Sequence, residues 1–154
     1  SSLFNEVLSC RMAEGSMAQL LEGDLAWLHD RRAIFPVTRE ELQDPELHLR
    51  GQRFELSPSG PLWGRDLPAA SGHPGSIEDS VFSAAGLPPP RACSSFTVPT
   101  GTRRPLRTPV RETRVDTGSD AHGAYIQVDF TLDRGQYATV LLEEIMKAGL
   151  PSRA

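Results

Sequence analysis

Apolar and polar residues alternate most regularly between residues 124 and 132. The apolar positions on one face are Ile126, Val128, Phe130 and Leu132. A period of two residues is typical of a β-strand with one buried face. The segment LDRGQYATVLLEEI, 132–145, follows directly, and its Asp133 and Gln136 have the spacing of a helix capping box. We therefore expect a strand, a tight turn at Gly135 and a helix.

The pattern at the start of the chain has the helical period instead. Apolar residues recur at helical spacing in SSLFNEVLSCRM, which predicts a helix over 1–12 that ends near Gly15. A short second helix is expected over 16–21. The segment 23–37 then predicts a hairpin, because two short apolar runs flank a polar turn at 29–32.

The elements predicted for the middle of the chain depend mainly on capping residues, glycines and prolines. Thr38 and Glu41 predict a capped short helix, which Asp44 and Pro45 should end. The stretch 57–75 has the composition of a loop.

A further helix should begin at Ser76 and run through Ala85. The proline-rich tract 87–95 is expected to be a linker, and 116–123 a turn or loop. Residues 97–110 are expected to be an edge strand or a crossing segment, because Pro105 and Pro109 interrupt them. Together these elements predict an α+β fold with a mixed or antiparallel sheet.

Composition narrows the class of protein without naming a reaction. Apolar residues make up 38% of the 154 residues and the formal net charge is −4, so a packed core is expected and a general polycation is excluded. The two cysteines and four histidines lack metal-binding spacing, so we expect no metal site. No long apolar run or signal peptide is visible, which predicts a cytoplasmic protein without a membrane span.

One part of the chain is locally basic. Residues 91–114 contain a single acid, Glu112, and six arginines: Arg91, Arg103, Arg104, Arg107, Arg111 and Arg114. Arginine forks bind phosphates, so this run could hold a nucleic-acid backbone. Alternatively, it is a solvated strand face balanced by acids in residues 1–90. Trp63 is similarly either a core residue beneath a loop or a stacking platform for a base.

Five segments, taken together, resemble the TruD family of tRNA pseudouridine synthases. In chain order they are SSLFNEVLSCRM, LLEGDLAWL, SPSGPLWGRD, GTRRPLRTPV and FTLDRGQYATVLLEEIMK. Their order matches the family order and they span nearly the whole chain. Asp133 and Arg134 depart from the family, which has a proline and a small residue before the turn glycine.

The resemblance implies an enzyme that converts uridine 13 of tRNA to pseudouridine without a metal or organic cofactor. Residues 1–95 would be part of the inserted domain of the family, and 96–154 the end of its catalytic domain. The catalytic aspartate of the family lies in a Gly-x-Lys-Asp motif, and no Lys-Asp pair exists in this sequence. No catalytic residue is therefore expected here; the nucleophile should lie upstream, and the chain alone should be inactive.

The resemblance also implies substrate-binding residues. Tyr137 should lie near the target base, or else anchor its helix to the sheet. Arg103 and Arg104 should meet phosphate or a carboxylate of the pocket. Gly135 permits the tight turn, and Asn5 should tie its helix to neighbouring backbone.

Two alternatives remain at this point. The chain could be an RNA-binding module without catalysis, or a structural and interaction domain whose arginines pair with acids in 1–90. The first predicts salt-dependent binding of tRNA and the second predicts none. The oligomeric state is not predicted.

Overall fold

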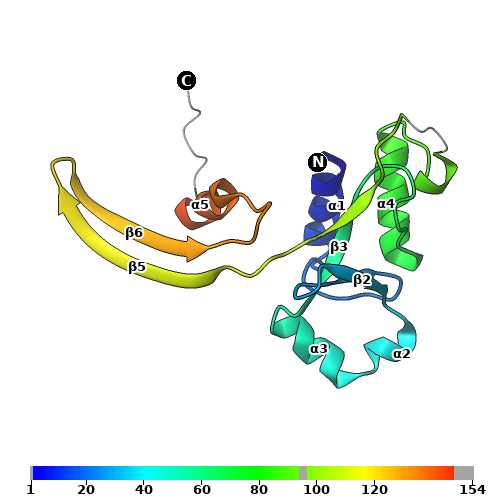
Figure 1. Cartoon of the computed structure of the whole chain (residues 1–154), viewed down its shortest axis with the longest axis horizontal. Helices are drawn as coiled ribbons and strands as arrows, with labels where there is room; N and C mark the ends of the chain where they lie inside the picture. The colour runs from blue at the N-terminus through cyan, green and yellow to red at the C-terminus, as the bar shows by residue number, and fades with distance from the viewer. Residues whose placement is uncertain (1, 94–96, 148–154) are drawn as a thin grey trace. The chain divides into compact units, whose positions relative to one another are not determined.

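The computed structural model describes residues 2–93 and 97–147. These residues form two compact units, which divide between Thr108 and Pro109. The first unit holds a four-stranded sheet with helices, and the second a two-stranded hairpin and a helix (Figure 1). The neighbouring strands of both sheets are antiparallel. The predicted α+β class is confirmed.

The sheet of the first unit has the strand order β2-β1-β3-β4. These strands are Ala33–Pro36, Leu25–Leu28, Leu56–Leu62 and Thr102–Pro105, respectively. β1 and β2 form the predicted hairpin, with Leu25 opposite Pro36 and Leu28 opposite Ala33. β4 lies at the sheet edge, as its prolines predicted.

The prediction of a loop over 57–75 is wrong for residues 57–62, which belong to the central and buried strand β3, and for 72–75, which begin a helix. Pro58 and Pro61 are fully buried in β3. β3 pairs with β1 through 56–58 and with β4 through 59–62. Each half of the strand therefore has a partner on one side only, so a proline can occupy it without breaking a ladder on the other side.

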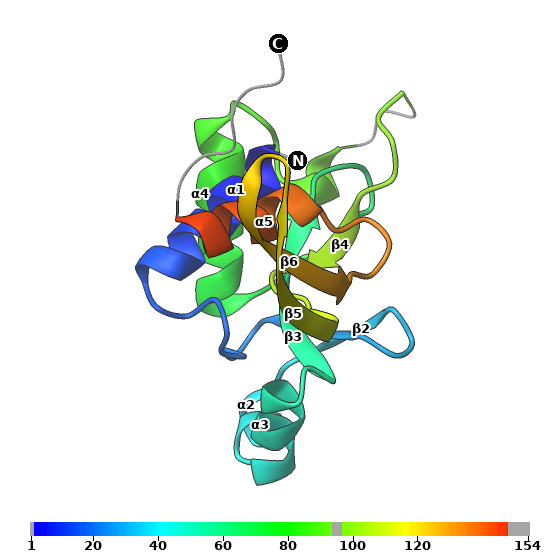
Figure 2. The ribbon, with the colours of Figure 1, turned by 90° about the vertical axis from the view of Figure 1, so that its left-hand side faces the viewer.

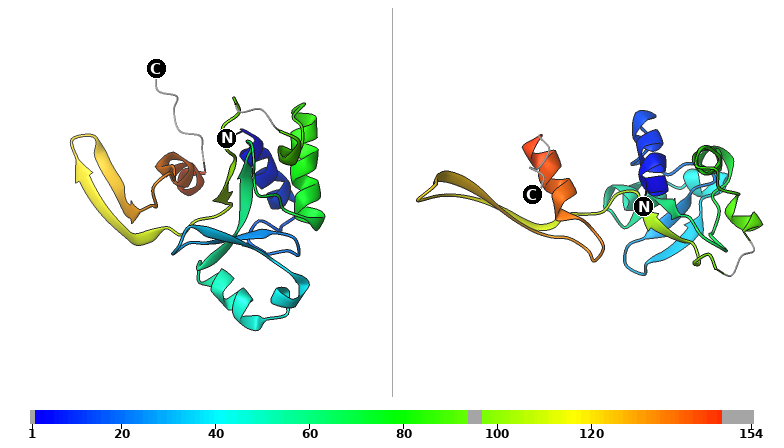
Figure 3. Two further views of the ribbon diagram at one scale, coloured as in Figure 1. Left: turned by 45° about the vertical axis from the view of Figure 1, so that its right-hand side comes forward. Right: turned by 90° about the horizontal axis from the view of Figure 1, so that it is seen from above.

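Helix α1, Ser2–Ala13, confirms the first predicted helix. It packs against β3 and beside α4, Gly72–Ala84 (Figure 3). The second helix expected over 16–21 is absent: this stretch contains a turn at residues 17 and 18 and a bend at 19. The physical reason is that the backbone oxygens of Ser16 and Gln19 accept hydrogen bonds from the Arg11 side chain, at 3.0 and 2.8 Å.

The capping box predicted for α2, Arg39–Leu42, is present. Asp44 does end this helix, but it also caps another, α3, Pro45–Gln52. Its Oδ1 accepts from the backbone nitrogen of Glu46 at 2.9 Å, and proline is well suited to the first helical position. α4 begins at Gly72 and not at Ser76.

The predicted linker 87–95 is not extended in its described part. Residues Pro90–Ala92 form a single 3-10 turn, in which Pro90 is buried. The backbone oxygen of Pro88 accepts a hydrogen bond from the Trp63 indole at 3.2 Å. Residues 94 and 95 lie outside the described residues. Trp63 is half-buried and its indole is tied to this tract.

The core of the first unit lies between the sheet and α3. Ala26, Val37, Leu47 and Leu56 form its central cluster. Half-buried Leu20, Leu28, Phe35 and Leu42 pack against it. Burial of these side chains supplies the main stabilising free energy of this unit.

The second unit contains β5, Arg111–Asp120, and β6, Gly123–Thr131, followed by α5, Ala138–Met146 (Figures 1 and 2). β6 confirms the alternating strand. The loop expected over 116–123 is wrong, because β5 continues to Asp120 and pairs with β6 along its length. Its sequence DTGSD carries no apolar alternation, so the partner strand determines its conformation.

Candidate functional site

The arginine run does not form one continuous basic stripe. Its arginines contact different kinds of group. Arg103 pairs with Glu78, Arg111 with Asp133 and Arg114 with Asp116, whereas Arg104 lies over the Phe4 ring and Arg107 over the Phe54 ring. Only one of these acids, Glu78, belongs to residues 1–90. The run is therefore divided between ion pairs and aromatic contacts.

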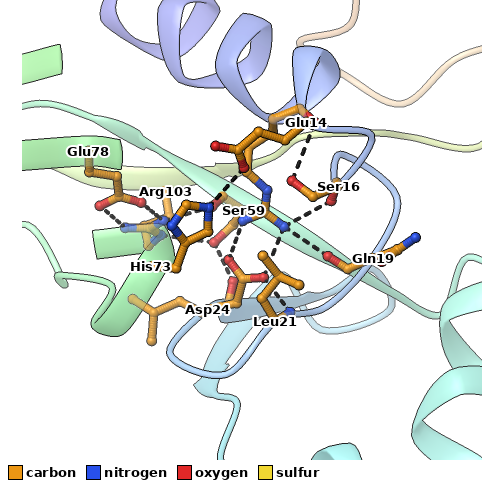
Figure 4. A network of polar contacts seen from close by, with 11 residues as sticks. Glu14, Ser16, Gln19, Leu21, Asp24, Ser59, His73, Glu78 and Arg103 are labelled. Carbon is orange, nitrogen blue, oxygen red and sulfur yellow. Dashed lines mark hydrogen bonds and ion pairs between the residues drawn. The ribbon is translucent and has the colours of Figure 1, made fainter. Parts of the chain in front are cut away.

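Arg103 is the most constrained of these side chains. It is 3% exposed, and its guanidinium makes five hydrogen bonds. Nε donates to Ser59 Oγ at 2.8 Å, Nη1 to Pro68 O and Glu78 Oε2, and Nη2 to Ser59 O and Glu78 Oε1 (Figure 4). Five is the full donor capacity of a guanidinium. Arg103 was expected to meet either phosphate or a carboxylate. It meets a carboxylate, and it has no donor left for phosphate.

The Ser59 side chain connects three strands through this arginine. Its Oγ accepts from Arg103 on β4 and donates to the backbone oxygen of Leu25 on β1 at 2.5 Å. Glu78 comes from α4, so the same guanidinium also joins that helix to the sheet. Glu78 was not among the residues expected from the sequence, since a single acid on a helix gives no signal of its buried partner.

A second buried ion pair was likewise not expected. Arg11 on α1 and Asp24 before β1 are 2% and 1% exposed. Nη1 and Nη2 of Arg11 donate to the two carboxylate oxygens of Asp24 at 2.8 and 3.1 Å. The Asp24 carboxylate also accepts from the backbone nitrogen of Leu21 at 2.8 Å. This network fixes the turn that follows α1.

Arg104 and Asn5 lie toward the surface of the first unit. The Arg104 side chain is half-buried, with its guanidinium carbon 5.3 Å from the centre of the Phe4 ring. Asn5 is exposed on α1, and the described residues give its side chain no hydrogen bond. The backbone tie expected for Asn5 is therefore not observed. Both residues are accessible at least in part to a ligand.

Gly135 and Tyr137 belong to the second unit. Gly135 has a φ of +91°, a left-handed conformation that glycine adopts without strain, as the predicted tight turn requires. Tyr137 is the N-cap residue of α5 and is 66% exposed. The predicted side-chain capping box is wrong, because α5 begins after Tyr137 and Asp133 instead pairs with Arg111 at 2.8 Å. The two expected site groups thus belong to separate units.

Several large apolar side chains of the second unit are exposed. Ile126 is 71% exposed, Val115 65% and Val140 64%. Among the described residues from 109 to 147, none reaches the buried class. Tyr137 is itself 66% exposed in this unit.

The part of the chain that the structure describes offers neither of two other kinds of site. No group of three or more His, Cys, Asp or Glu side chains in it could hold a metal ion. None of its helices has the length and apolar character needed to cross a bilayer.

The antiparallel α+β fold of this chain is shared by a solved structure. A crystal structure of a protein assigned to tRNA pseudouridine synthase D (TruD) from Methanosarcina mazei is similar, with a TM-score of 0.75 and 25% identity. The match covers 96% of this chain and 36% of that one.

The sequence comparisons identify the family. The family model for tRNA pseudouridine synthase D (TruD) matches residues 1–145. A relative of this name from Geobacter metallireducens is 37% identical, over 98% of this chain and 35% of its own length. One from Thermus thermophilus is 36% identical, over 96% of this chain and 38% of its own length. This chain belongs to the TruD family. It spans little more than a third of the length of these curated relatives.

Proposed function

We propose that the chain is part of a tRNA pseudouridine synthase that converts uridine 13 of tRNA to pseudouridine. The observation that carries this proposal is the match of the family model to residues 1–145. The proposed partner is tRNA, and the proposed location is the cytoplasm. No cofactor is proposed.

The reaction sets physical demands that the proposal must meet. The bond between N1 of uracil and the ribose breaks, the ring turns, and a bond forms from ribose to C5; C5 loses its hydrogen as a proton and N1 gains a proton. The uridine must first leave its stack and enter a pocket. A carboxylate acts in the covalent or elimination step. Because no Lys-Asp pair exists in this sequence, we place that carboxylate outside the given residues.

Tyr137 is the residue of the second unit that we propose to lie against the target base. Its exposed ring follows the Gly135 turn, and it caps a helix without being buried. A rigid aromatic ring gives favourable stacking on a uracil at low entropic cost. Gly135 acts indirectly, by setting the turn that presents the ring.

In the first unit, Arg104 and Asn5 are the proposed RNA contacts. The Arg104 guanidinium is oriented by Phe4 and is only half-buried. Arg103 is proposed as a positioning residue and not as an RNA contact, since all its donors are engaged by Ser59, Pro68 and Glu78. It holds β4, and so the neighbouring Arg104, in place.

The domain assignment stays a proposal as well. We assign residues 1–95 to the inserted domain of the family and the remainder to the end of its catalytic domain. The contacts support a later border, because β4 pairs with β3 and the first compact unit extends to Thr108.

The test is a chimera assayed by tritium release. This chain replaces the matching segment of the Thermus thermophilus relative, and the protein is incubated with tRNA carrying tritium at C5 of uridine. Release of tritium is expected because the C5 hydrogen is displaced. A chimera without the Gly-x-Lys-Asp aspartate is the negative control, and the 154-residue chain alone should release none. A folded chimera that binds tRNA without releasing tritium contradicts the proposal.

A second function is favoured for the isolated chain by the missing Lys-Asp pair. Without a nucleophile, the chain by itself is proposed to act as an RNA-binding module. It should bind tRNA with an affinity that falls as salt rises. Charge reversal Arg104→Glu should weaken this binding without unfolding the chain; if binding is unchanged, the structural and interaction alternative is favoured.

A further inference from the structure

A pocket of about 350 Å³ lies within the first unit, and neither Arg103 nor Arg104 lines it. The turn after α1, helix α3 and Arg107 form its walls. Its apolar surface includes Leu20 and Leu47. Its polar lining comes from Gln19, His48, Gln52 and Arg107, and it includes no carboxylate. The volume is within the usual range for small-molecule sites.

Arg107 is held in a fixed orientation at this pocket. Its Nη2 donates to the backbone oxygen of Gly51 at 2.5 Å and to that of Leu56 at 3.4 Å. Its guanidinium carbon lies 4.6 Å from the centre of the Phe54 ring. These contacts limit the rotation of the side chain, so little further entropy is lost when it binds a ligand.

The charge of Arg107 has no acidic partner among the described residues. Arg107 is half-buried, and the two fully buried arginines, Arg11 and Arg103, each have a carboxylate within ion-pair distance. Among the described residues, the Arg107 guanidinium contacts backbone carbonyl oxygens and the Phe54 ring. Its Nε is buried without a hydrogen bond in the described structure. Burial lowers the pKa of this guanidinium because it disfavours the charged form. A nearby anion would restore the lost stabilisation.

The other walls of the pocket are also fixed. The backbone oxygen of Gln19 accepts from Arg11 Nη2 at 2.8 Å, which ties this wall to the buried ion pair (Figure 4). His48 Nε2 donates to the backbone oxygen of Leu42 at 3.0 Å, so this ring nitrogen carries a proton. The amides of Gln19 and Gln52 add neutral donors, and Leu20 and Leu47 offer an apolar surface for a sugar or base.

We propose that this pocket binds a phosphate group of the RNA backbone, with Arg107 as its principal cation. The identity of the ligand as RNA rests on the proposed function. The phosphate chemistry itself does not, because it follows from an unpaired cation, neutral donors and the absence of acids in the lining. Because Nη2 of Arg107 already donates to two backbone oxygens and its Nε is buried, Nη1 is the group that would donate to a phosphate oxygen.

The first experiment asks whether the pocket takes phosphate at all. The nitrogen-15-labelled 154-residue chain is titrated with inorganic phosphate, and with chloride at equal ionic strength. Saturable shifts specific to phosphate are expected at Gly51, Gln52 and the Arg107 side chain. Gln52→Glu brings a negative charge to the pocket without removing any bond of Arg107, and it should abolish these shifts. Equal responses to phosphate and chloride overturn the proposal.

The second experiment asks whether the phosphate belongs to RNA. The affinity of the chain for tRNA is measured from 50 to 300 mM salt for Arg107→Gln, with Arg53→Gln as the control. Arg53 is exposed near the end of α3 and has its own acids, Glu46 and Glu55. Loss of one charge-assisted contact should weaken binding by about tenfold for Arg107→Gln. The slope of log affinity against log salt should fall by about 0.7–0.9.

The outcomes separate this proposal from the proposed function. If phosphate binds but Arg107→Gln and Arg53→Gln bind tRNA alike, the pocket takes a free phosphate and the RNA assignment is wrong. If Arg107→Gln does not fold, Gln52→Glu gives the same comparison, since its side chain is exposed. If the chimera releases tritium while the Arg107 and Gln52 variants bind tRNA normally, the proposed phosphate pocket is wrong and the proposed enzyme function is unaffected.

Discussion

Arg103 and Glu78 form a buried two-pronged ion pair, with Nη2 2.5 Å from Oε1 and Nη1 3.2 Å from Oε2. The pair joins β4 to α4, two elements that are far apart in the sequence. Removing one partner of a buried pair leaves an uncompensated charge in the core. The pair is therefore a structural element of the first unit, although its arginine lies in a motif that resembled a phosphate contact.

Glu78→Ala should lower the free energy of unfolding of the first unit by about 3–5 kcal/mol, because the Arg103 guanidinium would stay buried without its carboxylate. Urea unfolding followed by circular dichroism measures this. Asp79→Ala on the same helix is the matched control: Asp79 is exposed, and the change should stay within about 0.5 kcal/mol. Equal effects of the two substitutions would show that the pair contributes nothing.

Gly64→Ala tests the packing of the loop before β4. A Cβ atom at Gly64 would lie 2.4 Å from the backbone oxygen of Pro99 and 2.6 Å from the backbone nitrogen of Gly101. Backbone atoms cannot yield as a flexible side chain does, so overpacking should cost about 1–3 kcal/mol or more. Gly51→Ala is the control, since its Cβ would meet only Arg107 Nη2, at 3.8 Å. Thermal unfolding compares the two; an unchanged midpoint for Gly64→Ala contradicts the close approach.

Amide hydrogen exchange should distinguish the two units in the intact chain. The second unit buries none of its described residues, and a two-stranded hairpin by itself is marginally stable in water. Amides in the ladder of β5 and β6 should therefore exchange much faster than those of β1 and β3. Mass spectrometry of exchanged peptides measures this. Similar protection in both ladders would mean that the hairpin and α5 are covered by other polypeptide, such as a second copy of the chain.

Tyr137→Ala should separate binding from stability. The ring is 66% exposed, so its removal should change the free energy of unfolding by no more than about 0.5 kcal/mol. In the chimera, loss of a stacking ring should reduce tritium release by roughly 5- to 100-fold, whereas Tyr137→Phe keeps the ring and should retain most of the activity. A substantial loss of stability in Tyr137→Ala would instead identify the ring as a packing residue.

Local sequence patterns predicted the elements that local chemistry stabilises. The apolar spacing of 1–12 and the alternation of 124–132 correspond to α1 and β6, and the Thr38–Glu41 capping box forms as expected. The ordered motifs also indicated the family that the comparisons then showed. These features depend on residues within a few positions of one another, so one sequence is enough to identify them.

The tertiary structure decided the features that depend on distant partners. β3 is a strand despite two prolines because β1 and β4 each pair with half of it, and residues 116–120 become a strand because β6 pairs with them. Arg103 faces Glu78, whereas Arg107 meets no acid among the described residues, for the same kind of reason: which arginine meets a carboxylate depends on chain packing. The sequence determined that a group of arginines exists, and only the fold determined which of them are available to a ligand.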